Sequence, residues 1–99
     1  MTKAELEEQI KKDNLPTMVE FYADWCGPCH VMEPMLNELR TELEGKAKII
    51  RIDVDAEQAL SQEYDVLSIP TMVFYRDGKI VKELVGLQQK PALLPFLTA

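Results

Sequence analysis

Two cysteines, Cys26 and Cys29, are the residues of this chain whose type and spacing point most directly to chemistry. An apolar run over residues 17–22 ends before them, and an amphipathic run over residues 31–43 begins after them. A strand that leads into a helix places Cys26 at or near the helix N-terminus, where free N–H groups and about half a positive charge favour a thiolate. Cys29 lies one helical turn later, close enough to form a small disulfide ring. The pair therefore indicates thiol–disulfide exchange, with Cys26 as the natural nucleophile.

A metal site is the alternative for such a cysteine pair. A structural zinc ion needs four ligands, and this sequence offers two cysteines and one histidine. The histidine, His30, directly follows Cys29 and lies about 100° around the helix from it, which is a poor arrangement for a shared ion. We therefore expect no metal, and we expect His30 to be a solvated helix residue rather than a proton shuttle.

Activation of the thiol explains only part of a fast exchange reaction. A free thiol with a pKa near 8.5 is about 3% ionised at pH 7, and a pKa of ~7 raises that fraction about sixteenfold. The nucleophilicity of the thiolate falls about fivefold at the same time, so the net gain is about threefold. Positioning the target disulfide in line with Cys26 must therefore supply more of the rate.

Composition and charge describe an ordinary globular chain with one domain, residues 1–99. Apolar residues make up 46% of the sequence and charged residues 28%. The net charge of −6 argues against binding to nucleic acid or to an anionic membrane surface. The N-terminus is polar, without the apolar core of a signal peptide, and no run approaches the ~20 apolar residues of a membrane span. We therefore expect a monomer in the reducing cytoplasm, where a Cys-x-x-Cys pair is more often catalytic or metal-binding than structural.

Hydrophobic periodicity and turn residues divide the chain into helices and strands. Helices are predicted at about 3–13, at 26–44, at 55–64 with Asp55 as its cap, and from Pro91 onward; strands are predicted at 17–22, 48–54, 71–76 and 79–85. This order indicates a parallel strand pair joined by a helix, then an antiparallel hairpin that turns at Asp77-Gly78. The partly polar strand 48–54 belongs near a sheet edge. Helices must cover both faces of such a sheet, so the predicted fold class is α/β with a four-stranded mixed sheet.

Glu20 is the one charged residue in the apolar strand at 17–22. Its neighbours indicate burial, and an unpaired buried carboxylate is costly and has a raised pKa. Pairing between the first two strands would bring Arg51 beside it, and a guanidinium lowers the pKa of a carboxyl group. The alternative to a buried, paired carboxyl group is an exposed carboxylate at the end of the strand.

The motif Trp-Cys-Gly-Pro-Cys at residues 25–29, with Ile-Pro-Thr at 69–71 and Val-Gly at 85–86, resembles the thioredoxin family in order and spacing. The resemblance covers nearly the whole chain. It implies a thioredoxin-like three-layer fold in which four helices flank the four-stranded sheet and the N-terminal strand of the family is absent. It also implies a protein-disulfide reductase that needs no bound cofactor.

The resemblance implies roles for individual residues. Cys26 attacks the target disulfide, Cys29 resolves the mixed disulfide, and Pro70 is cis and packs beside the cysteines. The backbone of Ile69 pairs with the extended substrate. The substrate-binding residues implied in this way are Trp25, Gly27, Pro28, Ile69, Pro70 and Gly86, with Leu87 as a further candidate.

Two charged residues also match positions of the family. Glu20 corresponds to its buried acid, which is usually Asp, and Arg51 to the basic residue nearby, which is usually Lys. The hypothesis that follows is that Glu20 accepts the Cys29 proton during resolution, with a purely structural ion pair as the alternative. His30 stands where bacterial members commonly have lysine.

The expected electron donor is a thioredoxin reductase, and so indirectly NADPH, and the expected acceptors are proteins that contain disulfides. Two alternatives stay open. The first is a thiol oxidase or isomerase on the same fold, because about 30 mV of reduction potential corresponds to only ~1.4 kcal/mol for this couple. The second is a non-catalytic module that presents a peptide groove. The Gly27-Pro28 pair favours the reductase over the first, and the intact cysteine pair argues against the second.

Overall fold

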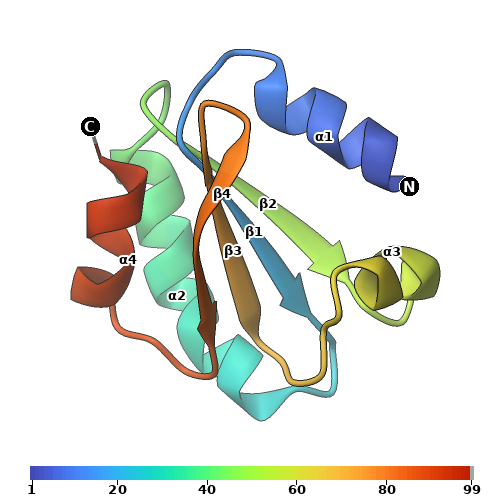
Figure 1. Cartoon of the computed structure of the whole chain (residues 1–99). Helices are drawn as coiled ribbons and strands as arrows, with labels where there is room; N and C mark the ends of the chain where they lie inside the picture. The colour runs from blue at the N-terminus through green and yellow to red at the C-terminus, as the bar shows by residue number, and fades with distance from the viewer. Residues whose placement is uncertain (99) are drawn as a thin grey trace.

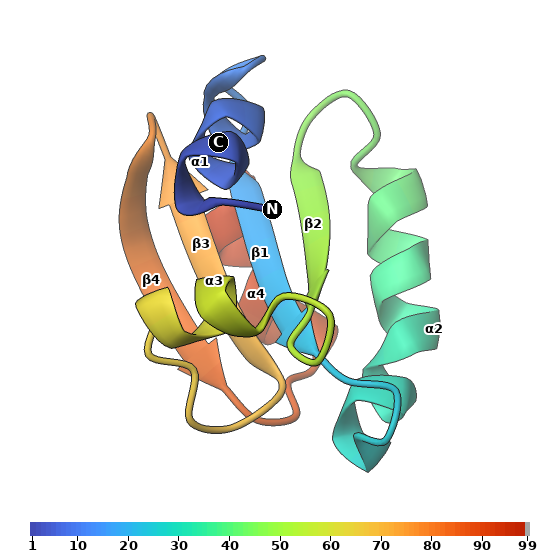
Figure 2. The same ribbon diagram turned by 90° about the vertical axis from the view of Figure 1, so that its right-hand side faces the viewer.

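The computed structural model describes residues 1–98 as a mixed sheet with helices on both faces. The elements are, in chain order, α1 (Lys3–Lys11), β1 (Thr17–Tyr22), α2 (Gly27–Glu42), β2 (Lys48–Asp53), α3 (Gln58–Glu63), β3 (Thr71–Arg76), β4 (Lys79–Val85) and α4 (Lys90–Leu97). Helices α2 and α4 cover one face, and α1 and α3 cover the other (Figures 1 and 2). The predicted three-layer architecture is therefore confirmed.

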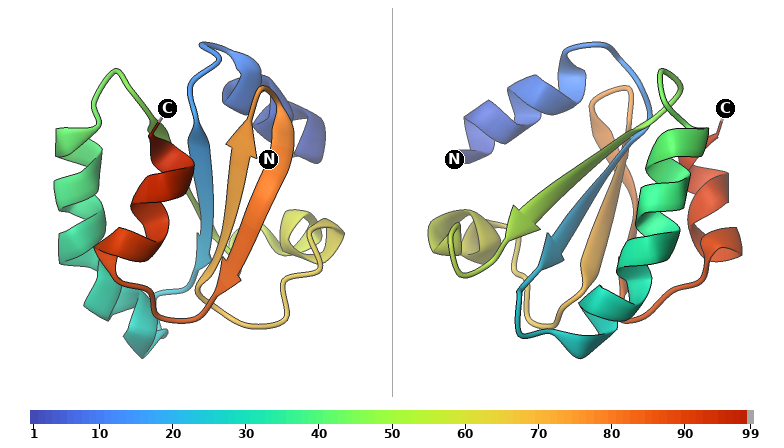
Figure 3. Two further views of the ribbon diagram at one scale, coloured as in Figure 1. Left: turned by 60° about the vertical axis from the view of Figure 1, so that its left-hand side comes forward. Right: turned by 180° about the vertical axis from the view of Figure 1, so that it is seen from behind.

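The sheet has the strand order β2-β1-β3-β4. Strand β1 pairs in parallel with β2 and antiparallel with β3, and β3 pairs antiparallel with β4. The crossover from β1 to β2 runs through α2, which lies beside α4 (Figure 3). The register pairs Glu20 of β1 with Arg51 of β2, so the central strand and an edge strand bring these two charges together.

Each face of the sheet has its own hydrophobic core, because successive side chains of a strand point to opposite faces. Met18 and Met72 belong to the core under α2 and α4, and Val19 and Val73 belong to the core under α1 and α3. Glu20 has the same parity in β1 as Met18 and so points toward the side of the sheet that α2 covers. An acid is thereby placed beneath the helix that begins at the cysteines.

Local signals explain where several elements begin and turn. Thr2 and Glu5 form the predicted capping box at the start of α1: the Glu5 N–H donates to Thr2 Oγ1 at 3.1 Å and the Thr2 N–H to Glu5 Oε1 at 2.8 Å. Asp77 and Gly78 have φ of 54° and 76°, the left-handed conformation that a tight hairpin turn requires. Within the described residues, no helix has the length and apolarity needed to cross a membrane.

Each of the four helices differs from its predicted bounds at one end or both, with α3 at Gln58–Glu63 rather than 55–64, and β2 ends at Asp53 rather than residue 54. Helix α1 ends at Lys11 rather than residue 13, because Asn14 turns the chain with a φ of 53° and the Asp13 carboxylate pairs with Lys48 Nζ at 2.9 Å. Helix α2 spans Gly27–Glu42 rather than 26–44, and α4 begins one residue before Pro91.

The predicted role of Asp55 as a helix cap is wrong. Helix α3 begins at Gln58 with Glu57 at its N-cap position. The Asp55 carboxylate instead accepts a hydrogen bond from the Trp25 indole at 2.8 Å. A long-range partner therefore takes the side chain that the sequence pattern assigned to a local cap.

Leu6 tests how strongly α1 is held to the sheet. Leu6→Ala removes a side chain that is 0% exposed in the core under α1, so we expect the free energy of unfolding to fall by about 2–5 kcal/mol. Leu67→Ala makes the same chemical change at a side chain that is 96% exposed and should cost less than about 0.5 kcal/mol. Urea unfolding measures both values. Equal losses in the two variants would contradict the packing described for α1.

Candidate active site

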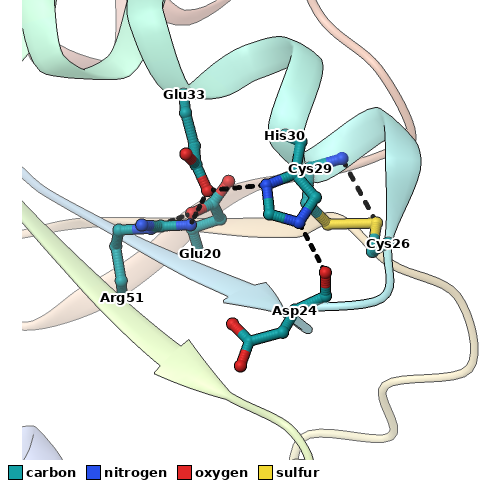
Figure 4. Close-up of polar contacts among 7 residues, drawn as sticks. All are labelled: Glu20, Asp24, Cys26, Cys29, His30, Glu33 and Arg51. Atoms are coloured by element: carbon teal, nitrogen blue, oxygen red, sulfur yellow. Dashed lines mark hydrogen bonds and ion pairs between the residues drawn. A yellow bond between two sulfur atoms is a disulfide. The ribbon is translucent and has the colours of Figure 1, made fainter.

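The cysteine pair lies at the junction of β1 and α2. Cys26 is the N-cap residue of α2, and its sulfur accepts a hydrogen bond from the Cys29 N–H at 3.2 Å. The two residues are joined in a disulfide, with their Cα atoms 5.3 Å apart (Figure 4). An N-cap sulfur faces the unpaired N–H groups and the positive end of the helix dipole, which stabilise a thiolate after reduction.

Both cysteines are packed against apolar neighbours. Cys26 is 4% exposed and Cys29 1% exposed, and together with Ala23 they form a small cluster that Tyr22 and Ile69 contact. Both cysteines are thus largely shielded, and Cys26 is slightly the more exposed of the two.

A second chain segment closes the site on the side of β3. The Ile69–Pro70 peptide bond is cis, and the carbonyl oxygen of Pro70 accepts a hydrogen bond from the Gly86 N–H at 2.8 Å. Gly86 has a φ of +88°, a conformation that favours glycine, and no atom stands within 4 Å of where a Cβ would be. Gly86 is thus suited to this position by its backbone conformation rather than by lack of space.

The surface around the disulfide is apolar and exposed. Trp25 is 70% exposed, and its ring is oriented by the hydrogen bond from its indole N–H to Asp55. Gly27 and Pro28 are exposed in the first turn of α2. A shallow groove beside Trp25 is lined by Val54, Ser61, Val66, Leu67, Ser68 and Ile69. Further large exposed apolar side chains on the chain include Val31, Leu67, Val85 and Leu87.

Glu20 is fully buried, and Arg51 is its ionic partner. The Arg51 Nε–H donates to Glu20 Oε1 at 2.7 Å, while Glu20 Oε2 has no hydrogen-bond partner among residues 1–98. Burial raises the pKa of the Glu20 carboxyl group above its ordinary value, and the nearby Arg51 only partly opposes this. A half-satisfied buried carboxyl with a raised pKa has the properties of a proton acceptor.

Arg51 has further contacts besides Glu20. Its guanidinium lies 3.9 Å from the centre of the Tyr22 ring, and its Nη2 lies 3.6 Å from Glu33 Oε1. The same Glu33 oxygen lies 3.2 Å from His30 Nδ1. His30 Nε2 faces the backbone carbonyl of Asp24 (Figure 4). A continuous series of polar contacts therefore runs from the buried acid to the surface beside the cysteines.

The predicted residues fall into two groups around the disulfide. Glu20 and Arg51 form an ion pair in the sheet, and Ile69 packs against the cysteines. Trp25, Gly27 and Pro28 flank the cysteines in sequence, and Gly86 bonds to the Pro70 carbonyl. Sequence reasoning missed Glu33 and Asp55. Glu33 stands seven residues after Cys26, two helical turns, so a helical projection would have placed it on the cysteine face of α2. Asp55 gave no local signal of its contact with Trp25.

The redox pair is the chemistry that this arrangement offers. Cys26 and Cys29 form a disulfide with their Cα atoms 5.3 Å apart, within the ordinary range for such a bond. Among residues 1–98, no group of three or more His, Cys, Asp or Glu side chains is placed to hold a metal ion. The Cys26–Cys29 disulfide is the group of this site that can exchange electrons with another pair of thiols.

Comparisons with known proteins agree with this chemistry. The family model described as Thioredoxin matches residues 1–99. The chain is 34% identical over 97 residues to a thioredoxin of Rickettsia felis, covering 98% of this chain and 92% of the relative. It is 38% identical over 97 residues to a thioredoxin of Staphylococcus aureus, covering 98% and 91%.

A solved structure gives the same result. A mutant thioredoxin from Halobacterium salinarum NRC-1 superposes with a TM-score of 0.83 at 40% identity, covering 98% of this chain and 83% of that one. Thioredoxins exchange disulfides with target proteins and with a reductase. With the Cys26–Cys29 disulfide at the start of α2 and a sheet that superposes on a solved thioredoxin, the chain belongs to the thioredoxin family and is a thiol-disulfide oxidoreductase that reduces protein disulfides.

Proposed function

We propose that the reductase reaction proceeds through a mixed disulfide on Cys26. The Cys26 thiolate attacks one sulfur of the target disulfide, and the other target sulfur leaves as a thiolate that takes up a proton. Cys29 then loses its proton and attacks the Cys26 sulfur. The target leaves as a dithiol with two added electrons and two added protons, and the chain is left with the Cys26–Cys29 disulfide. The observation that carries this order is the N-cap position of Cys26, the slightly more exposed of the two cysteines.

Docking of the target is assigned to the apolar surface around the disulfide. Trp25 provides a large exposed ring beside the sulfurs, and the groove next to it can take an apolar side chain of the target. The backbone of Ile69, adjacent to the cysteine cluster, is suited to pair with an extended target segment. Activation of the thiol raises the exchange rate only about threefold. We therefore expect these contacts to supply more of the rate by aligning the target disulfide with Cys26.

Glu20 is the proposed acceptor of the Cys29 proton. Its raised pKa means that it binds a proton more readily than an ordinary surface glutamate, and its free oxygen leaves room for a further hydrogen bond. It also faces α2, the helix that holds Cys29. Arg51 keeps the carboxyl group oriented through its 2.7 Å contact to Oε1.

Electrons reach this chain, in our proposal, from NADPH through a thioredoxin reductase, and the reaction takes place in the cytoplasm. The net charge of −6 favours protein partners over nucleic acid. A redox titration against glutathione checks the direction of the reaction. A potential near −270 mV fits a reductant, and one above about −180 mV fits an oxidase or isomerase.

The two cysteines should respond differently to substitution. Cys29→Ser leaves the attack intact but removes the resolving thiol, so it should accumulate a covalent complex with insulin and lose turnover by at least about 10³-fold. Cys26→Ser removes the nucleophile and should form no such complex. NADPH-coupled insulin reduction and non-reducing electrophoresis report the two results. Normal turnover of the Cys26→Ser variant would contradict the role of Cys26 as the nucleophile.

Glu20→Gln tests proton transfer during resolution. The amide cannot accept the Cys29 proton, so release of the reduced target should slow by about 10²-fold, the lower end of general-base contributions. Single-turnover insulin reduction with the reduced protein measures this step. Glu63→Gln makes the same change at an exposed site on α3 and should leave the rate unchanged. An unchanged rate for Glu20→Gln would remove the proposed role.

The pH dependence of the unfolding free energy of Glu20→Gln distinguishes a carboxyl group with a raised pKa from a purely structural ion pair. Because the folded chain holds the Glu20 proton more tightly than the unfolded chain, stability from this group is complete below about pH 4.5 and is lost as pH rises through the raised pKa. The unfolding free energy of Glu20→Gln minus that of the parent should therefore increase from about pH 4 to about pH 8. A decrease over this range would indicate that the anion stabilises the fold.

A further inference from the structure

Arg51 stands between two carboxylates that can compete for its charge. Its Nε contacts the buried Glu20 at 2.7 Å, and its Nη2 lies 3.6 Å from the partly exposed Glu33. Nη2 is buried and has no hydrogen-bond partner among residues 1–98, so a small movement of Glu33 toward it would complete a hydrogen bond. The Arg51 guanidinium thus has a close partner, the buried Glu20, and a more distant one, the partly exposed Glu33.

His30 contacts Glu33, the more distant of these two partners. Its Nδ1 faces the Glu33 carboxylate at 3.2 Å, and its Nε2 faces the carbonyl oxygen of Asp24 (Figure 4). Both neighbours are acceptors, and a neutral imidazole carries only one N–H. Only the imidazolium can donate to both, so this arrangement suits the charged ring.

We propose that Glu33 and His30 are positioning residues that set the charge of Glu20 through Arg51, and thereby the rate at which Cys29 resolves the mixed disulfide. This proposal rests on the proposed role of Glu20. When His30 is charged, it holds the Glu33 carboxylate, and Arg51 acts fully on Glu20. When His30 is neutral, Glu33 turns to Arg51, and the buried acid binds its proton more tightly.

Few other charged groups surround Glu20 and could change its pKa. From β2 the charged neighbour is Arg51, and from α2 the charged groups that act on Glu20 are Glu33 and Arg40. From β3 the register partner is Met72, which carries no charge. The Glu33 carboxylate also raises the pKa of Glu20 by direct like-charge repulsion, in the same direction as competition for Arg51.

Glu33→Gln is the first test, with a direct readout on Glu20. Carboxyl-carbon NMR titration of the reduced protein should show the Glu20 midpoint lower by about half a pH unit, since Arg51 then acts on one carboxylate only. The pH profile of single-turnover resolution should shift in the same direction by the same amount. Glu38→Gln is the matched control: it lies on the same helix, 66% exposed, and pairs with Lys90 at 3.8 Å, so neither curve should move.

His30→Gln gives a shift of the opposite sign. Without the imidazolium, Glu33 is free for Arg51 at every pH, so the Glu20 midpoint should rise. In a chain that already carries Glu33→Gln, the change at His30 should move the midpoint by less than half as much. An equal shift in both backgrounds would mean that the His30 charge acts directly through space, and would overturn the proposed route through Glu33.

The outcomes separate this proposal from the one that it rests on. An unmoved Glu20 midpoint in Glu33→Gln overturns the coupling. A moved midpoint with an unmoved rate profile also overturns the proposal, because the charge of Glu20 would then not limit resolution. If Glu20→Gln leaves the rate unchanged, the failure lies in the proposed role of Glu20, and the NMR titration still reports the coupling separately.

Discussion

The hydrogen bond from the Cys29 N–H to the Cys26 sulfur is the local interaction on which the site depends. It makes the reactive sulfur the N-cap of α2, a role that usually falls to an oxygen side chain. The same contact therefore begins the helix, directs the helix dipole at the sulfur, and holds the second cysteine within bonding distance. Strand β1 and helix α2 fix the remaining geometry by packing on either side of this junction.

Burying the charged side chains of Glu20 and Arg51 costs folding free energy that apolar side chains at the same positions would not. A buried Glu20–Arg51 pair gains little over a well-packed apolar pair, because both charges lose their hydration. Glu20 keeps one oxygen without a partner among residues 1–98, which adds to that cost. Such a cost is consistent with a group retained for chemistry, and the chain limits it by placing Arg51 on an edge strand, where the guanidinium remains partly solvated and stacks on Tyr22.

The sequence predicted the strands well and the long-range side-chain contacts poorly. Strands at 17–22, 71–76 and 79–85 match the structure, because apolar runs and the Asp77-Gly78 turn are local signals. The pairing of Glu20 with Arg51 also followed from strand order alone. Asp55 was assigned wrongly because its partner, Trp25, lies thirty residues away in sequence. Glu33 was overlooked because an exposed helix glutamate has no distinguishing pattern until Arg51 is placed beside it.

The site is assembled from three distant parts of the chain, and this has a consequence during synthesis. The cysteines stand at 26 and 29, whereas the Pro70 carbonyl and the Gly86 N–H that bond beside them lie far later. Strand β1 pairs with β3 as well as with β2, so the central strand lacks a neighbour until residue 76 has left the ribosome. For most of translation both thiols are thus attached to an incomplete sheet. In that state oxidants and the cysteines of other nascent chains can reach them. The complete site forms only when the last third of the polypeptide has folded.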